Sequence, residues 1–296
     1  MKKTLIIIGG PTAVGKTKLA IKLAHQLQSY IISADSRQFY KELNIGVAKP
    51  SKLDICKTPH HFIGHKSIHN DYSVGEYEQD ALLIINKLFK QKDILLVCGG
   101  SGLYIDALCE GLHQFPEINK TVKKKLEEDL QKKGLITLTK ELKKNDPKTY
   151  KKIDTKNPRR VIRALEVYRS SGKPYSFYLQ KKKKKRNFNT LFIALQKKRE
   201  TLYRLINARV DKMIDDGLLA EVKSLYPYKD KKALQTIGYQ EIFKYLDQKT
   251  TINEAVEEIK KNTRRYAKRQ INWFKQKKYY QIQEEQEAFE LMSQLI

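Results

Sequence analysis

Cysteine is scarce in this sequence, and long apolar stretches are missing from it. Its three cysteines, Cys56, Cys98 and Cys109, lie far apart and form no CxxC pair, which argues against a disulfide framework or a cysteine-based zinc site. No run approaches the roughly 18 apolar residues of a membrane span. The apolar start, 5–8, is too short for a signal peptide and leads directly into a glycine loop. We therefore expect a cytoplasmic protein with no membrane partner.

Acidic residues are also in short supply. Lys and Arg number 59 against 33 Asp and Glu, which gives a net charge of +26. A charge this large favours a polyanionic partner, because neutralising phosphates releases counterions. A general abundance of surface lysine would give the same charge, so both explanations stay open. The 40% hydrophobic and 31% charged content indicates a folded chain, and 296 residues suit one large domain or a core with a smaller insert.

Short apolar runs alternate with helical patterns in much of the chain. The runs occur at 4–8, 30–33, 94–98 and 190–195. Their continuous apolar character is typical of buried parallel strands. Helical spacing marks 16–28 and 76–91 between them. This order predicts an α/β fold with a parallel sheet and helices on both faces.

A helical segment without strand signals interrupts this pattern, and we predict an all-α insertion domain at 113–189. Within it, Asn157 and Pro158 suit the N-cap and first position of a helix, which ends near Gly172. Five lysines and an arginine at 181–186 indicate a solvated linker.

The remaining residues, 1–112 and 190–296, form the predicted core with C-terminal helices. Residues 199–280 have a helical pattern, with Gly217 as a helix stop and Gly238 as a break.

A G-x-x-x-x-G-K-T loop between the first strand and first helix is the strongest local motif. It consists of Gly10, Pro11, Thr12, Ala13, Val14, Gly15, Lys16 and Thr17. The glycines let backbone N–H groups face a phosphate, and the helix N-terminus adds a favourable dipole. Lys16 supplies charge and Thr17 an oxygen for Mg²⁺. The motif indicates a diphosphate or triphosphate site in a P-loop NTPase-like sheet.

Two further motifs follow strands of the predicted sheet, where ligands of open α/β sheets bind. Asp35 follows the second strand and can serve as a general base, a metal ligand or a simple turn residue. The sequence GGSGLY, from Gly99 to Tyr104, follows the strand 94–98. An NTPase often has a carboxylate at such a position, whereas glycines permit either close substrate approach or a tight turn. Ser101 adds a hydroxyl.

These motifs and several later ones resemble tRNA dimethylallyltransferases, also called tRNA isopentenyltransferases. The shared segments are GPTAVGKT, DSRQFYKELNIGVAKP, PHH, GGSGLY, NPRRVIRALE, RVDKM, IGYQE and TRRYAKRQ, in this order over nearly the whole chain. Ser101 departs from the threonine that is commoner in the family, but the hydroxyl is kept. Because the zinc finger of eukaryotic relatives is not in this sequence, the resemblance implies the bacterial type.

The resemblance implies transfer of a dimethylallyl group from dimethylallyl diphosphate to tRNA. The acceptor is the exocyclic amine of the adenosine 3′-adjacent to the anticodon, and the products are isopentenyladenosine and diphosphate. The P-loop then holds the diphosphate, with Mg²⁺ on Thr17. The implied catalytic residues are Asp35 as general base, with Thr12 and Arg209 at the leaving group. A monomer is expected.

The implied macromolecular partner is the anticodon stem-loop of tRNA. Its expected contacts are Asp35, Ser36, Arg37, Gln38, Ser101, Lys123, Arg159, Arg160, Val161, Ile162, Arg163, Arg264 and Lys268. Arg159 and Arg163 lie four residues apart on one helix face and can reach a phosphate together, although an exposed charged face explains them as well. Cations and aromatics alternate at 260–280, where we favour a helix buried on one side and facing phosphates on the other.

Two other functions remain possible from the motifs alone. A P-loop kinase of small molecules would show ATP-dependent phosphoryl transfer. A non-catalytic, GTPase-like RNA-binding module should have an NKxD motif after 190–195, and the sequence has none there. His61, His65 and His69 recur every four residues, but Gly64 interrupts a continuous helix, so we favour loop or substrate contacts over a metal site.

Overall fold

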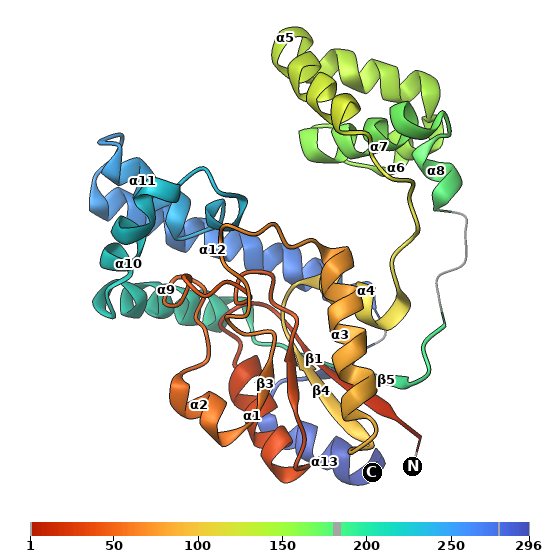
Figure 1. The fold of residues 1–296 in the computed structure, drawn as a ribbon. Coiled ribbons are helices and arrows are strands. Elements are labelled where there is room, and N and C mark those ends of the chain that lie inside the picture. The colour runs from red at the N-terminus through yellow and green to blue at the C-terminus, as the bar shows by residue number, and fades with distance from the viewer. Residues whose placement is uncertain (1, 180–184, 278, 296) are drawn as a thin grey trace. The chain divides into compact units, whose positions relative to one another are not determined.

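The computed structural model describes residues 2–179, 185–277 and 279–295. The chain divides into two compact units (Figure 1). We call Met1–Cys109 with Arg186–Ile296 the core unit, and Glu110–Lys185 the insert unit. The insertion that the sequence predicts spans 113–189.

An all-parallel sheet of six strands, in the order β3-β2-β4-β1-β5-β6, forms the centre of the core unit. The strands are β1 (Thr4–Gly9), β2 (Ile31–Ser33), β3 (His60–His61), β4 (Ile94–Cys98), β5 (Asn189–Leu195) and β6 (Tyr280–Ile282). The predicted parallel sheet is thus confirmed. Sequence patterns missed β3 and β6, and β6 begins in a stretch predicted to be helical.

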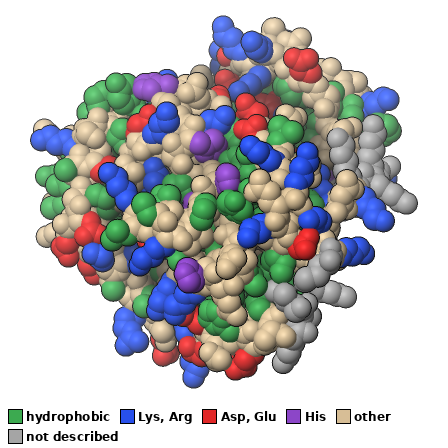
Figure 2. All heavy atoms as spheres, turned by 60° about the horizontal axis from the view of Figure 1, so that its bottom comes forward, with side chains coloured by type: hydrophobic (Ala, Val, Ile, Leu, Met, Phe, Trp, Pro, Cys, Tyr) green, Lys and Arg blue, Asp and Glu red, His purple; other side chains and the backbone are tan. Residues whose placement is uncertain are grey.

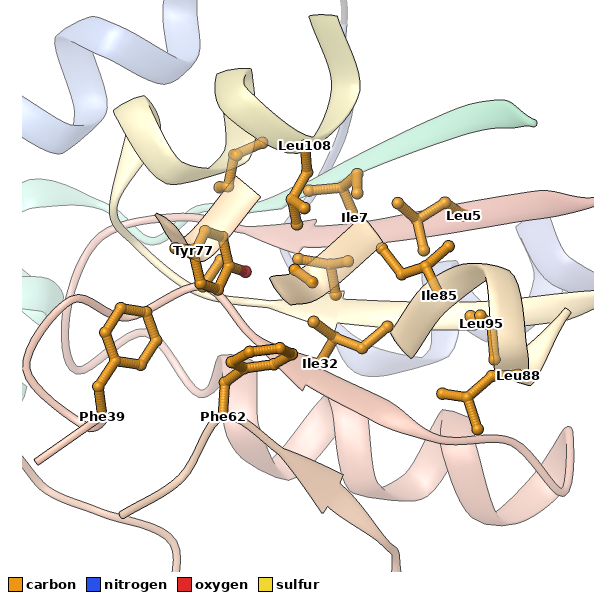
Figure 3. Packing of buried hydrophobic residues seen from close by; sticks show 14 of the residues in the cluster. Leu5, Ile7, Ile32, Phe39, Phe62, Tyr77, Ile85, Leu88, Leu95 and Leu108 are labelled. Atoms are coloured by element: carbon orange, nitrogen blue, oxygen red, sulfur yellow. The ribbon is translucent and has the colours of Figure 1, made fainter. Parts of the chain in front are cut away.

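Helices cover both faces of this sheet, as predicted. Leu5 and Ile7 of β1 pack with α3 (Val74–Leu88) and α4 (Gly102–Glu110) on one face (Figure 3). Ile6 and Ile8 point the other way because side chains alternate along a strand. They pack with α1 and α13. The bounds of these two helices are Lys16–Gln26 and Glu285–Leu295.

The C-terminal half of the core unit is mainly helical. Its helices are α9 (Arg199–Asp215), α10 (Leu218–Leu225), η1 (Tyr226–Tyr228), η2 (Lys232–Leu234), α11 (Tyr239–Leu246) and α12 (Ile252–Lys275). Gly217 and Gly238 precede α10 and α11 with φ of 99° and 94°, which confirms both predicted breaks. The short helix α2 (Lys52–Lys57) precedes β3. No helix in the described ranges has the length and apolarity needed to cross a membrane.

The insert unit has its own small hydrophobic core. Its helices are α5 (Lys120–Asn145), α6 (Pro147–Lys152), α7 (Pro158–Ser171) and α8 (Tyr175–Tyr178). The Asn157 side chain caps α7 by accepting from Arg159 N–H at 3.1 Å, and Gly172 ends it with φ of 70°, as predicted. Leu126 and Leu165 are fully buried between the helices.

Arg186 corrects the predicted solvated linker at 181–186. Residues 181–184 lie outside the described residues. The Arg186 side chain, however, is only 9% exposed and forms an ion pair with Glu78 at 2.6 Å. It also donates to the Leu108 carbonyl at 2.8 Å. Because its charge is compensated within the core unit, Arg186 is a structural residue that fixes the start of the segment leading to β5.

Candidate functional site

The phosphate loop has the backbone geometry that its glycines predict. Gly15 has φ of 102° directly before α1, and Gly10 has φ of 136°. A Cβ atom at Gly10 would lie 2.7 Å from the Leu195 carbonyl oxygen, so β5 leaves no room for a side chain there. Lys16 Nζ donates to the Pro11 carbonyl at 2.7 Å and so closes the loop on itself. The loop is therefore shaped by its own lysine and by the neighbouring strand.

Lys16 and Arg209 place two cations beside this loop. Burial lowers the pKa of Lys16 to about 8, and Arg209 acts in the same direction, while Cys98 and Asp35 oppose the shift. Arg209 extends from α9, and its Nη1 lies 3.5 Å from Thr12 Oγ1. Burial also lowers the pKa of Arg209, and the Asp35 carboxylate opposes this shift. Two partly desolvated cations beside the loop are a suitable site for a phosphate group.

Asp35 lies on the same side as these cations and also stabilises a turn. Its Oδ1 accepts from Arg37 N–H at 3.0 Å, the bond of an Asx turn. The carboxylate interacts electrostatically with Lys16 and Arg209. The two interpretations of this residue are therefore compatible, because the turn directs the carboxylate to the phosphate loop.

The GGSG turn after β4 is packed tightly against its neighbours. A Cβ atom at Gly99 would lie 2.3 Å from the Ala34 carbonyl oxygen, and one at Gly102 would lie 2.3 Å from the Trp273 ring. Glycine is thus required at both positions, because a backbone carbonyl at Gly99 and an aromatic ring at Gly102 leave no room for a side chain. Ser101 Oγ accepts from Ser36 N–H at 3.3 Å, which places its hydroxyl beside the Asp35 turn.

Two residues of α12 that were not predicted as site residues also belong to this arrangement. The Gln270 side chain bonds to the backbone of Thr12 and Gly100, both at 2.9 Å. Burial raises the pKa of Tyr266 to about 12, with Asp35 acting in the same direction and a bond to Ser101 opposing it. The sequence signal that could have identified Gln270 was a polar amide on the buried face of an amphipathic helix. The burial of Ala267 and Phe274 on α12 agrees with the predicted one-sided helix.

Two side chains expected to contact RNA form hydrogen bonds within the protein. Arg37 Nη1 donates to the carbonyls of Lys232 and Ala233 at 3.1 and 3.0 Å. Gln38 Nε2 donates to the Ala48 carbonyl at 3.0 Å. These bonds fix the segment after Asp35, and RNA contacts of Arg37 and Gln38 stay a prediction.

Residues 161 and 162, which were also expected to contact RNA, contribute to the hydrophobic core of the insert unit. Val161 is completely buried in the hydrophobic core of that unit, and Ile162 is half-buried against the same cluster. The Val161 side chain is thus held inside the insert unit, and an RNA contact of this residue stays a prediction.

The expected cations are distributed over both units. Lys123, Arg159, Arg160 and Arg163 are exposed on helices of the insert unit. Arg163 lies 3.3 Å from Glu166, so its charge is partly compensated. In the core unit, Arg264 donates to Asn207 at 2.7 Å, whereas Lys268 is exposed. Figure 2 shows lysine and arginine spread over the visible face with acidic residues between them.

A cavity of about 300 Å³ adjoins the phosphate loop in the core unit. Leu195, Ile271 and Phe274 contribute apolar walls, and Gly10 and Pro11 of the phosphate loop also line the cavity. Its further lining includes Lys197, Arg199, Lys268 and Lys275. The cavity combines an apolar interior with cations, on α12 and after β5.

The three regularly spaced histidines have different surroundings. His61 lies in β3, and its ring centroid is 5.9 Å from that of Tyr30. His65 packs edge-on against Phe39 and Phe62. His69 packs against Tyr228 at 4.9 Å. Their spacing therefore does not reflect one helix face.

The chain matches a family model described as IPP transferase over residues 38–277. The chain belongs to the IPP transferase family. It is 49% identical to the tRNA dimethylallyltransferase of Christiangramia forsetii, over 93% of this chain and 91% of the relative. As a member of this family, it is a transferase with a P-loop NTPase-like fold. The matched region includes Ser101, Arg209 and Gln270.

Solved structures of the family agree with this assignment. The full-length tRNA isopentenylpyrophosphate transferase of Bacillus halodurans is 36% identical, with a TM-score of 0.70, over 95% of this chain and 90% of that one. A eukaryotic dimethylallyltransferase acting on tRNA is 30% identical, with a TM-score of 0.78, over 92% of this chain and 69% of that one. IPP transferases that are distant in sequence thus share this architecture.

Proposed function

We propose that this IPP transferase moves the dimethylallyl group of dimethylallyl diphosphate to tRNA. The acceptor is the exocyclic amine of the adenosine 3′-adjacent to the anticodon. The observation that best supports this proposal is the pair of cations Lys16 and Arg209 facing the carboxylate of Asp35. An anion cradle next to a potential base suits a reaction in which an anionic group leaves and an amine loses a proton. We assign the reaction to a cytoplasmic monomer.

The leaving diphosphate requires stabilisation as its negative charge develops. In the transfer, a bond forms between the amine nitrogen and C1 of the dimethylallyl group. The C1–oxygen bond breaks, and its electron pair leaves with the diphosphate. Lys16, Arg209 and the hydroxyl of Thr12 are positioned to interact with this charge, together with N–H groups of the loop. Because the loop is preformed by its glycines, little reorganisation accompanies the reaction.

Asp35 is the proposed acceptor of the proton released by the amine. The Asx bond from Arg37 N–H uses Oδ1, so Oδ2 is available for proton transfer. The Ser101 hydroxyl, held by Ser36 N–H, is the proposed contact to the same nucleotide. Flipping the adenine out of a single-stranded anticodon loop costs less than flipping it from a duplex.

The residues at the loop are compatible with Mg²⁺ held mainly by the substrate. Thr17 offers a hard hydroxyl oxygen next to the Cys98 thiol, and Mg²⁺ prefers oxygen ligands, including phosphates and water. A bound Mg²⁺ would neutralise charge on the diphosphate. The protein's own contribution is Thr17, with Asp35 close to the same cations.

Exposed cations are proposed to hold the tRNA by its phosphates. In the insert unit these are Lys123, Arg159, Arg160 and Arg163, and in the core unit Lys268. The half-buried Arg264 is a further proposed contact of the core unit. Arg159 and Arg160 lie in the first turn of α7. Contacts to phosphates orient the tRNA and make its binding salt-dependent, but they do not give base specificity.

A transfer assay tests the proposal directly. Purified protein is incubated with Mg²⁺, dimethylallyl diphosphate and unmodified tRNA, and the digested tRNA is analysed for isopentenyladenosine. We expect product only when both substrates are present. Absence of product, with ATP turnover in a parallel reaction, would instead support a kinase.

A further inference from the structure

Gln270 connects the two loops that flank the proposed reaction site. Its Oε1 accepts from Thr12 N–H at 2.9 Å, and its Nε2 donates to the Gly100 carbonyl at 2.9 Å. The side chain comes from α12, far from both loops in sequence, and the residue is only 6% exposed. A buried amide that satisfies one donor and one acceptor on different loops is a specific cross-link.

The surrounding atoms leave this amide little freedom. A Cβ atom at Gly100 would lie 2.2 Å from Gln270 Nε2, so the bond requires glycine at this position. The helix is held on the next turn as well, where Trp273 contacts Gly102 and Phe274 contacts Gly9. Because these rings anchor α12, the backbone of Gln270 has a fixed position, from which its side chain reaches both loops.

We propose that Gln270 is a positioning residue that sets the spacing between the phosphate loop and the Ser101 turn. This inference rests on the proposed transferase function. Thr12 belongs to the loop that holds the leaving diphosphate, and Gly100 precedes the hydroxyl that contacts the acceptor nucleotide. Gln270 touches neither substrate in this scheme. It aligns the leaving diphosphate with the attacking amine. Misalignment of the reacting atoms lowers the transfer rate more than it lowers the affinity for the substrates.

The protonation state of a glutamate at this position provides a sharp test. In Gln270→Glu, the ionised carboxylate can still accept from Thr12 N–H but faces the Gly100 carbonyl as a second acceptor. The protonated acid restores the wild-type pattern, because its O–H can donate to Gly100. Burial favours this neutral form and raises the pKa of the introduced acid. Activity relative to wild type is therefore expected to return as the pH falls.

Single-turnover transfer at saturating substrates is measured between pH 8 and pH 5.5. We expect Gln270→Glu to be slower than wild type by about a hundredfold at pH 8 and to recover by up to about tenfold per pH unit on acidification. Gln270→Met, which can make neither bond, is expected to be slow by a constant factor over this range. Dissociation constants for tRNA and dimethylallyl diphosphate should change by less than about threefold in both variants.

Gln276→Glu is the matched control, since it introduces the same charge at an exposed position at the end of α12. It is expected to follow the wild type at every pH. A ratio of Gln270→Glu to wild type that does not change with pH would overturn the inference, as would a Gln270→Met variant with wild-type rate. If the glutamate variant does not fold, the rate and binding constants of Gln270→Met decide alone. An inactive wild-type protein would instead contradict the proposed transferase function itself.

Discussion

The charged side chains at the site of the core unit are partly buried, whereas those on the basic surface of the insert unit are exposed. In the core unit, the side chains near the phosphate loop are half-buried or buried, and Gln270 and Arg209 bond to the loop itself. In the insert unit, Arg159 and Arg160 are exposed at the start of α7. Fixed groups can stabilise charge at a defined position, whereas exposed cations attract a polyanion over a longer range. We therefore expect chemistry and RNA affinity to respond to different substitutions.

Removing the base from the core site should have the largest effect. Asp35→Asn keeps an oxygen for the turn bond to Arg37 N–H but cannot accept the proton. We expect the transfer rate to fall about a thousandfold, while the dissociation constant for tRNA changes less than about twofold. Asp35→Ala should behave similarly in rate. The exposed Asp230→Asn is the control. Equal losses of rate and tRNA affinity would show that Asp35 is structural, and they would contradict the expected separation of chemistry from RNA affinity.

Two glycine substitutions compare the packing of the units. Gly99→Ala forces a Cβ atom against the Ala34 carbonyl and should cost about 3 kcal/mol of unfolding free energy. Gly172→Ala in the insert unit meets no atom within 4 Å, and its positive φ alone should cost about 1 kcal/mol. Trp273, the single tryptophan, reports on the core unit in denaturant titrations followed by fluorescence. Its transition should shift only for Gly99→Ala, and similar shifts for both variants would contradict separate packing.

The pH dependence of ligand binding should be a property of the core site. Because burial lowers the pKa of Lys16 to about 8, its charged form is lost as the pH rises above this value in the free protein. Affinity for dimethylallyl diphosphate should be constant below about pH 7 and fall by up to about tenfold per unit above pH 8. Calorimetry without tRNA measures this dependence. Lys16→Arg, which keeps its charge, should abolish the decline. A decline that persists in this variant would assign it to another group.

Loss of one exposed cation from the insert unit should have the smallest effect. Arg159→Ala is expected to weaken tRNA binding by about three- to tenfold and to reduce the slope of log K against log salt by about 1. Binding titrations at several salt concentrations measure both values. The rate at saturating tRNA should remain unchanged. Lys52→Ala, an exposed cation of the core unit on α2, serves as control. An unchanged slope for Arg159→Ala would place this residue away from the RNA.

The longer elements of the fold could be predicted because their signals are local. Apolar runs identified β1, β2, β4 and β5, and glycines marked the breaks before α10 and α11. The strand β3 has only two residues, and β6 is defined by pairing with β5 across Ile193 and Tyr280. Such pairing depends on residues distant in sequence, which periodicity does not reveal.

The site was predictable to a similar extent. Motif spacing located the phosphate loop, Asp35 and Ser101, and the structure brings Asp35 and Arg209 to that loop. The contacts of Arg37 and Gln270 could not be predicted, since each bonds to backbone atoms more than a hundred residues away. A side chain's partners depend on which segments fold beside it, whereas the motif gives only its chemical type.

Arg186 fixes the place at which the chain returns from the insert unit to the core unit. Its bond to the Leu108 carbonyl joins the point where the chain re-enters the core unit to the end of α4, where the chain leaves that unit. Residues 110–185 therefore begin and end at one place on the core unit. Because all six strands belong to the core unit, the pairing of the sheet uses no residue of the inserted segment. We therefore expect substitutions in the insert unit to change tRNA affinity without disturbing the sheet that carries the phosphate loop.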